Sequence, residues 1–377
     1  MNLQRFVNWC ETANSRERIE GFAAIAHALL DGSVPSLERE AAETALAVAL
    51  DDPSPKVRAS LAAIIGLHER APAALVRGFL QDCEEIAVLV AASPVLDADD
   101  LLDAPALNRD RVHAAIAARV DLPGAVVAAI AVEGSAKVVT ALLGNPHADI
   151  SQGVLRLLAE RHGGDAGVRA LLVSRPLPPD IRQTLILETG RSLQESDLVR
   201  AVLGSNSRNV VFEACERATG GLAENTSPRE VPVLVEHLRG SGQLSVAFLL
   251  RAACLGNIDL LAASLTALSR LSERRVRAVL VECRDAPFRT LGLHCGLSAS
   301  ESELIRVATM CWKDIAMGRM DLKGGEAAES VLRRVAQTFG ERMKGPEDRE
   351  AFALLRRLQR ENARDVMRRR TERLLAA

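Results

Sequence analysis

The chain has 377 residues, of which 48% are hydrophobic and only 3% aromatic, and it contains no Tyr. This composition supplies enough apolar side chains for a buried core but disfavours a β-sandwich, which is enriched in aromatic and β-branched residues. The formal net charge is −2, yet residues 1–219 carry 29 acidic and 21 basic side chains, whereas residues 220–377 carry 20 acidic and 26 basic ones. This asymmetry indicates a second structural region towards the C-terminus.

Cysteine usage and hydropathy favour a reducing, aqueous compartment. Seven cysteines lie between Cys10 and Cys311 without a C-x-x-C pair, whereas a secreted disulfide framework normally has an even number at short spacing. The N-terminal residues lack the apolar core of a signal peptide. Charge-free apolar runs such as residues 123–132 have about half the length of a membrane-spanning helix. We therefore expect a cytoplasmic protein that does not associate with membranes.

Helical periodicity begins at the N-terminus. Apolar residues recur at helical spacing over residues 3–13, 16–30 and 38–50, with Ser36 as the expected cap of the third helix. Residues 1–50 are therefore predicted to form an N-terminal helical cap.

A repeated pattern follows over residues 51–219. A β-branched residue is followed four positions later by another apolar residue, and this pair recurs every 26 to 31 residues. The six copies are Val57/Leu61, Ile86/Val90, Val112/Ile116, Val138/Leu142, Val168/Leu172 and Val199/Leu203.

Each copy runs into a helix breaker, such as Pro94, Pro123 or Asn145–Pro146. Proline ends one helix and suits the first turn of the next. A pair of helices this short cannot bury its apolar face alone, so neighbouring pairs must stack. The sequence therefore predicts an all-α chain whose residues 51–219 form an α-solenoid of helix pairs shorter than the roughly 40-residue HEAT unit.

Four phrases carry a resemblance to a known family. They are DDPSPKVRASLA (Asp51–Ala62), ASPVLDADDLLD (Ala92–Asp103), AIAARVDLPGAVVAAIAVEG (Ala115–Gly134) and VVTALLGNPHADIS (Val138–Ser151). Over about residues 40–300 the chain resembles a HEAT-like family of bacterial proteins, chiefly alphaproteobacterial, that is classified as a domain of unknown function. The resemblance implies a cytoplasmic helical-repeat protein and supplies no catalytic residue.

After Gly220–Gly221 the repeat fades, although helical periodicity continues. We expect a helical continuation of the array over residues 220–317, a flexible break over residues 318–325, and C-terminal helices within residues 318–377. Ser300 and Glu303 have the spacing of a capping box at the start of a helix over residues 300–315. The last helix is expected over residues 348–375.

Residue types that bind metals do not have the spacing of a metal site. Cys283, His294, Cys295 and Cys311 lie in one region, but zinc sites favour short paired spacings. The carboxylates of Asp97, Asp99, Asp100 and Asp103 lack the glycine and closing glutamate of a Ca²⁺ loop, and a helix N-terminus with favourable carboxylates explains them better. We expect no metal and no cofactor.

Catalytic motifs are also missing from the sequence. His68–Glu69 is the only His-Glu pair, and G-x-S-x-G, P-loop and G-x-G-x-x-G motifs do not occur. Gly240–Ser241–Gly242 is too short to hold a phosphate and is expected to join two helices. These observations favour a protein that is not an enzyme.

The last helix is unusually basic. Arginines at positions 356, 357, 360, 364, 368, 369, 370 and 373 alternate with apolar residues including Phe352, Leu355 and Leu358. One interpretation is a solvated helix that packs a single apolar stripe on the body of the protein. The other is a segment that docks onto an acidic partner, in which Arg356, Arg357, Arg360, Arg364 and Arg368 are the candidate partner-binding residues.

These features favour a non-enzymatic scaffold or adaptor that binds protein partners on a solenoid surface. The alternative is a DNA-repair enzyme of the HEAT-like glycosylase type. It is disfavoured because residues 51–219 carry 22 acidic and 17 basic side chains, and because Trp9 and Trp312 lie outside that array. A chromophore lyase of the repeat type is a third possibility without a supporting residue. We therefore expect no nucleic-acid, membrane or small-molecule partner. The sequence leaves open the partner, the oligomeric state, the solenoid face used, and whether the last helix docks within the chain or on a partner.

Overall fold

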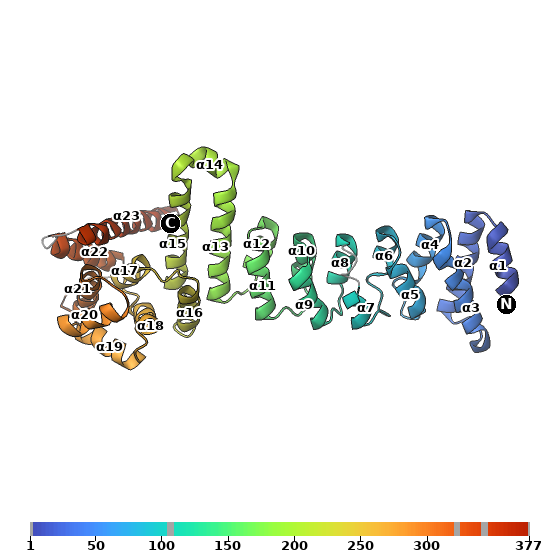
Figure 1. The fold of residues 1–377 in the computed structure, drawn as a ribbon, viewed down its shortest axis with the longest axis horizontal. Coiled ribbons are helices and arrows are strands. Elements are labelled where there is room, and N and C mark those ends of the chain that lie inside the picture. Colours follow the sequence, from blue (N-terminus) through green and yellow to red (C-terminus); the bar gives the residue numbers. More distant parts are fainter. Residues whose placement is uncertain (1–2, 104–108, 320–324, 341–345, 376–377) are drawn as a thin grey trace. The chain divides into compact units, whose positions relative to one another are not determined.

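The computed structural model describes residues 3–103, 109–319, 325–340 and 346–375. Within these ranges the regular structure is entirely helical and contains no strand, which confirms the predicted all-α class (Figure 1). The chain divides into two units, residues 1–176 and residues 177–377. The array expected over residues 51–219 therefore spans the boundary between these units. Most of the break expected over residues 318–325 lies outside the described residues.

The first unit consists mainly of short helices separated by proline, glycine or aspartate turns. They are α1 (Leu3–Thr12), α2 (Ser15–Asp31), α3 (Ser36–Ala47), η1 (Val48–Asp51), α4 (Pro55–Ile65), α5 (Ala73–Leu80), α6 (Glu84–Val90), α7 (Ala98–Asp103), α8 (Asp110–Ala117), α9 (Gly124–Glu133), α10 (Ala136–Gly144), α11 (Gln152–His162) and α12 (Ala166–Val173). Pro72 and Pro123 immediately precede α5 and α9, where a missing N–H group costs nothing. Ser36 is the first residue of α3, and the capping position is occupied by Pro35, which gives no side-chain hydrogen bond.

Helices of the first unit contact the helix two positions further along the chain. α2 packs on α4, α4 on α6, α6 on α8, α8 on α10, and α10 on α12 (Figure 1). In the same way, α7 packs on α9 and α9 on α11. Each helix pair thus buries its apolar side chains against the neighbouring pairs.

The repeated apolar pairs form the core of this unit. Both members of the first five pairs, from Val57/Leu61 to Val168/Leu172, are at most 1% exposed. Ile116, Leu142 and Leu172, the second members of three of these pairs, are therefore all buried. The sixth pair differs, because Val199 is only partly buried and Leu203 is exposed.

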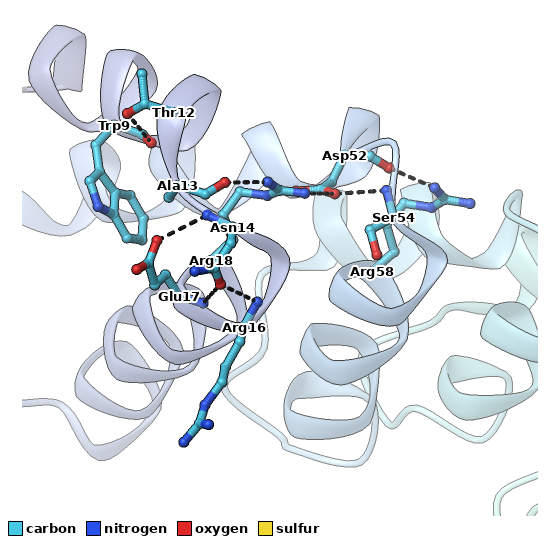
Figure 2. A network of polar contacts seen from close by, with 10 residues as sticks. All are labelled: Trp9, Thr12, Ala13, Asn14, Arg16, Glu17, Arg18, Asp52, Ser54 and Arg58. Carbon is cyan, nitrogen blue, oxygen red and sulfur yellow. Dashed lines mark hydrogen bonds and ion pairs between the residues drawn. The ribbon is translucent and has the colours of Figure 1, made fainter.

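Arginine and aspartate side chains link the first helices of this unit. Two nitrogens of Arg18 donate to the two carboxylate oxygens of Asp52 at 2.7 and 3.0 Å (Figure 2). Arg58 donates to the main-chain carbonyl of Asp52 at 2.6 Å and to both carboxylate oxygens of Asp82 at 2.7 and 3.1 Å. Arg109 continues the series by donating to the carbonyl of Asp82. Bidentate pairs of this kind fix the orientation of consecutive helices.

Beyond α7, side chains just after one helix cap the end of an earlier one. Arg119, which follows α8, donates to the Ser93 carbonyl at 2.6 Å, beyond the end of α6. Asn145, which follows α10, donates to the Ala117 carbonyl at the end of α8 at 2.9 Å. Arg175, after α12, donates to the Leu143 carbonyl near the end of α10 at 2.8 Å. The last carbonyls of a helix have no partner inside it, so these bonds join consecutive repeats.

The second unit has longer helices. They are α13 (Pro179–Glu195), α14 (Asp197–Leu203), η3 (Gly204–Asn206), α15 (Ser207–Glu224), α16 (Val231–Gly240), α17 (Val246–Leu255), α18 (Ile258–Ser269), α19 (Glu273–Glu282), α20 (Asp285–His294), α21 (Ala299–Ala316), α22 (Gly325–Gly340) and α23 (Pro346–Leu375). α13 and α15 pack along each other as a hairpin that α14 closes at one end (Figure 1). α17 lies among α18, α21 and α22, and its buried Leu249 and Leu250 share a core with Leu304 and Ile305 of α21.

The expected capping box at Ser300 and Glu303 is wrong by two residues. The Ser298 hydroxyl accepts a hydrogen bond from the Glu301 N–H group at 3.2 Å, and the Glu301 carboxylate accepts one from the Ser298 N–H group at 2.8 Å. The stretch SASESE offers two overlapping Ser-x-x-Glu frames. The first is used because the turn at Gly296, with φ of 75°, has already brought the chain to the start of α21.

Candidate protein-binding surface

Helix α23 is anchored to the second unit by its apolar residues. Ala351, Leu355 and Leu358 are buried against α22, α21 and α17. Phe352 stacks on Phe339 of α22, with ring centroids 6.4 Å apart and planes inclined by 19°. The spacing of these residues places them on one side of the helix, so the opposite side is directed towards solvent.

One of the predicted arginines is used inside the unit. Arg357 donates to Glu216 of α15 at 2.8 Å, and a second guanidinium nitrogen lies 3.8 Å from Glu213. Its Nε atom is 3.9 Å from the carboxylate of Glu361, one helical turn further on. Arg357 thus holds α23 on the acidic side of α15.

Glu361 extends this network to α17. Its carboxylate accepts a hydrogen bond from Arg251 at 2.8 Å, and the two side chains are only 12% and 11% exposed. Arg251 also pairs with Glu224 at 3.4 Å. Gly220 of α15 permits this arrangement, because a Cβ atom there would lie 2.3 Å from Nε of Arg251. Four carboxylates and two guanidinium groups therefore join α15, α17 and α23.

The other four predicted arginines are exposed on α23. Arg356, Arg360, Arg364 and Arg368 recur at intervals of four residues and so lie along one side of the helix. The guanidinium of Arg356 lies over the Phe352 ring, 5.1 Å from its centroid. We name the four exposed residues Arg356, Arg360, Arg364 and Arg368 the arginine stripe. The structure thus separates Arg357, which serves the packing of α23, from the arginine stripe.

A cleft of about 610 Å³ lies between α23 and the helices beside it. Glu224, Arg251 and Glu361 contribute ion-paired groups to its lining, and Trp312 contributes a ring. The Trp312 indole N–H group donates to the Cys254 carbonyl at 3.3 Å. Because these polar groups are already paired, the cleft offers no unpaired nucleophile or base among them.

Four cysteines of the second unit have pKa values above the ordinary value of a thiol. Burial raises the pKa of Cys254 to about 12 and that of Cys295 to about 11. Burial also raises the pKa of Cys283 and of Cys311. All four are therefore thiols at neutral pH, which disfavours nucleophilic chemistry and metal binding. Within the described part of the chain, no group of three or more His, Cys, Asp or Glu side chains is placed to hold a metal ion.

Asp97, Asp99 and Asp100 lie at the start of α7, as the sequence indicated, whereas Asp103 is the last residue of that helix. The Asp97 carboxylate accepts from the Asp100 N–H group at 2.9 Å, and the Asp100 carboxylate accepts from the Asp97 N–H group at 3.1 Å. Arg77 pairs with both carboxylates, at 3.2 and 2.7 Å.

Gly240–Ser241–Gly242 connects α16 to α17, and His68–Glu69 lies in the loop between α4 and α5.

Residues 87–345 match the bacterial family described as an uncharacterised protein conserved in bacteria (DUF2336). The chain belongs to the DUF2336 family. The matched region starts in α6 and includes α22. No curated protein and no solved structure matches the chain.

The arginine stripe lies outside the part that defines the DUF2336 family, because the match ends one residue before α23 begins. Three carboxylates of the network that joins α15, α17 and α23, those of Glu213, Glu216 and Glu224, lie inside it. Sequence reasoning missed these carboxylates, since Glu216 and Arg357 are 141 positions apart. The four-residue spacing of Arg357 and Glu361 was the one local signal of this network. None of the described helices is long and apolar enough to cross a membrane.

Proposed function

We propose that this DUF2336 protein is a non-enzymatic, cytoplasmic adaptor whose arginine stripe binds an acidic protein partner. Its first unit acts as a HEAT-like α-solenoid. The i to i+2 packing of its helices and the buried positions of five repeated apolar pairs support that description. A solenoid of this kind offers an extended surface for recognition rather than a closed catalytic pocket.

The observation that carries the proposal is that the arginines of α23 have two different environments. Arg357 is committed to Glu216, whereas Arg360 and Arg364 are exposed and form no ion pair with any residue that the structure describes. Their helix is held in place by Leu355 and Leu358, so both guanidinium groups are presented on a fixed support. Arginine binds carboxylates through two parallel hydrogen bonds and is enriched at protein interfaces.

An acidic protein suits this surface better than a nucleic acid does. Affinity for a phosphate backbone requires many neutralising side chains, and the arginine stripe supplies four. The four-residue spacing of the arginine stripe instead fits carboxylates repeated along a partner helix.

The proposal is tested by capturing partners from the source bacterium with the full-length chain, followed by mass spectrometry. Arg360→Glu combined with Arg364→Glu should abolish capture of the partner. Arg274→Glu combined with Arg275→Glu is the control, because both are exposed arginines on another helix, α19, and the charge change is the same. If both double variants lose partner capture equally, the loss is an effect of net charge, and the arginine stripe is not the binding surface.

A further inference from the structure

The end of the α13–α15 hairpin exposes an unusual concentration of large apolar side chains. Leu193, Leu198, Val202, Leu203, Val210 and Phe212 are between 37% and 73% exposed. α14 closes the hairpin (Figure 1), and none of its seven residues is buried. Leu198 and Val202 are four positions apart, so they share one face of α14. We name these six residues the hairpin patch.

The repeat pattern indicates that this patch is suited to burial. In the five preceding copies, the equivalent apolar pair is at most 1% exposed because a neighbouring helix covers it. The sixth copy retains Val199 and Leu203, but Val199 is only partly buried and Leu203 is 37% exposed. Clusters of exposed apolar residues on a folded protein mark interaction sites.

Two charged side chains flank the hairpin patch. Glu195 is the last residue of α13, and Arg208 is the second residue of α15. Both are exposed, and neither side chain forms an ion pair with any residue that the structure describes. The nearby Asp197 and Arg200 pair with each other at 2.8 Å. The end of the hairpin therefore carries one available charge of each sign and no strong field of either sign.

We propose that the hairpin patch binds the hairpin patch of a second copy of this chain, forming a twofold-symmetric homodimer. In a twofold interface, if residue i of one copy contacts residue j of the other, j also contacts i. Glu195 of each copy can therefore pair with Arg208 of the other copy. Two antiparallel helix pairs meeting in this way form a four-helix arrangement around the apolar side chains.

The charges favour a second copy over other occupants. A nucleic acid requires a basic surface, and an acidic or basic protein would leave either Arg208 or Glu195 facing a like charge. A second copy satisfies both groups and supplies its own matching apolar face. Phe212 is the expected anchor, since aromatic residues dominate the energetics of interfaces, and a stable interface buries about 800 Å² per partner.

The first experiment measures the mass of the full-length protein by sedimentation velocity over a range of concentrations. We expect a dimer for the wild-type chain and a monomer for Leu198→Glu combined with Val202→Glu. Leu293→Glu combined with Val281→Glu is the control, because these residues are similarly exposed but lie on α20 and α19. Far-UV circular dichroism establishes that each variant is folded.

The second experiment reverses the charges. Glu195→Arg alone and Arg208→Glu alone should each weaken the dimer at least tenfold, and the two changes together should restore it. Restoration is specific to a twofold contact between these residues, because a different protein partner would keep its original charges and would not match the reversed ones. The proposal is refuted if the wild-type chain is still monomeric at a protein concentration 100-fold above the lowest one at which its sedimentation can be measured. A dimer that the Leu198→Glu and Val202→Glu changes leave intact also refutes it.

Discussion

The Nη2 atom of Arg357 lies 2.8 Å from Oε2 of Glu216, so the basic helix α23 is joined to a carboxylate of α15 that lies 141 positions earlier in the chain. Both side chains are largely shielded from solvent. The attraction between them is therefore screened less than that of a fully exposed pair. Of the five candidate partner-binding arginines, this one contributes to the packing of α23.

Arg357→Ala should lower the free energy of unfolding by roughly 1–2 kcal/mol, between the values for exposed and buried ion pairs. The variant leaves Glu216 and Glu361 without this cation. Arg364→Ala is the matched control, since Arg364 is exposed on the same helix, and it should change stability by less than about 0.5 kcal/mol. Urea unfolding followed by circular dichroism measures both. Indistinguishable midpoints would show that the pair does not stabilise the unit.

Leu142→Ala should destabilise the first unit by roughly 2–5 kcal/mol, because the truncated side chain leaves a cavity in a core position that is 0% exposed. Leu67→Ala makes the same chemical change at a position that is 70% exposed. Its unfolding midpoint in urea should match that of the wild-type chain. Equal effects of the two substitutions would contradict the assignment of Leu142 to the repeated core.

The ion pair between Arg58 and Asp82 should make the first unit sensitive to acid. Burial alone would raise the pKa of Asp82, but hydrogen bonds from Arg58 and from the Cys83 N–H group outweigh burial and hold this pKa below its ordinary value. A carboxyl whose pKa is depressed on folding contributes stability above its unfolded pKa, near 3.9, and loses it as the pH falls through the folded value.

Asp82→Asn should therefore be less stable than the wild-type chain at pH 7, and the difference should shrink below about pH 4. Urea unfolding at a series of pH values gives both curves. Asp99→Asn serves as the control, because Asp99 also lies in the first unit but forms no ion pair with a described residue. A stability difference for Asp82→Asn that stays constant from pH 7 to pH 3 would rule out this linkage.

The repeated core could be predicted from the sequence because it depends on local spacing. A β-branched residue and an apolar residue four positions later lie on one helical face. This spacing alone therefore predicts that Val112/Ile116 and Val138/Leu142 are buried, as they are in the structure. The hydrogen bonds between repeats were harder to predict from the sequence. Arg119, Asn145 and Arg175 recur at about the repeat interval, but two residue types share the role, and their acceptors are main-chain carbonyls that any sequence provides.

The environment of α23 could be predicted only in part. Its apolar residues identified the anchored side, and Leu355 and Leu358 are indeed buried. Which arginine turns inward could not be read from the pattern, because Glu216 and Arg251 come from distant helices. The exposure of the sixth apolar pair could not be predicted from the sequence either. Val199/Leu203 has the same spacing as the buried pairs, and only the fold shows that Val199 is partly buried and Leu203 exposed.

The position of Glu361 predicts how the C-terminal helix responds to truncation. Removing residues 364–377 takes away Arg364 and Arg368 but keeps Glu361, whose carboxylate accepts from Arg251 at 2.8 Å. Removing residues 360–377 deletes Glu361 as well and leaves the nearly buried Arg251 with Glu224 alone, at 3.4 Å. The shorter deletion should leave the urea midpoint close to that of the wild-type chain, and the longer one should lower it.

Partner capture should respond differently to the same two deletions. Both remove half or more of the arginine stripe, so both should weaken capture of an acidic partner. Capture by the wild-type chain should also fall as salt is raised, because exposed charges are screened beyond about 8 Å at 0.15 M and about 3 Å at 1 M ionic strength. If the shorter deletion unfolds the protein, residues 364–377 are needed for stability. If it captures as much partner as the full chain, Arg364 and Arg368 do not contribute to binding.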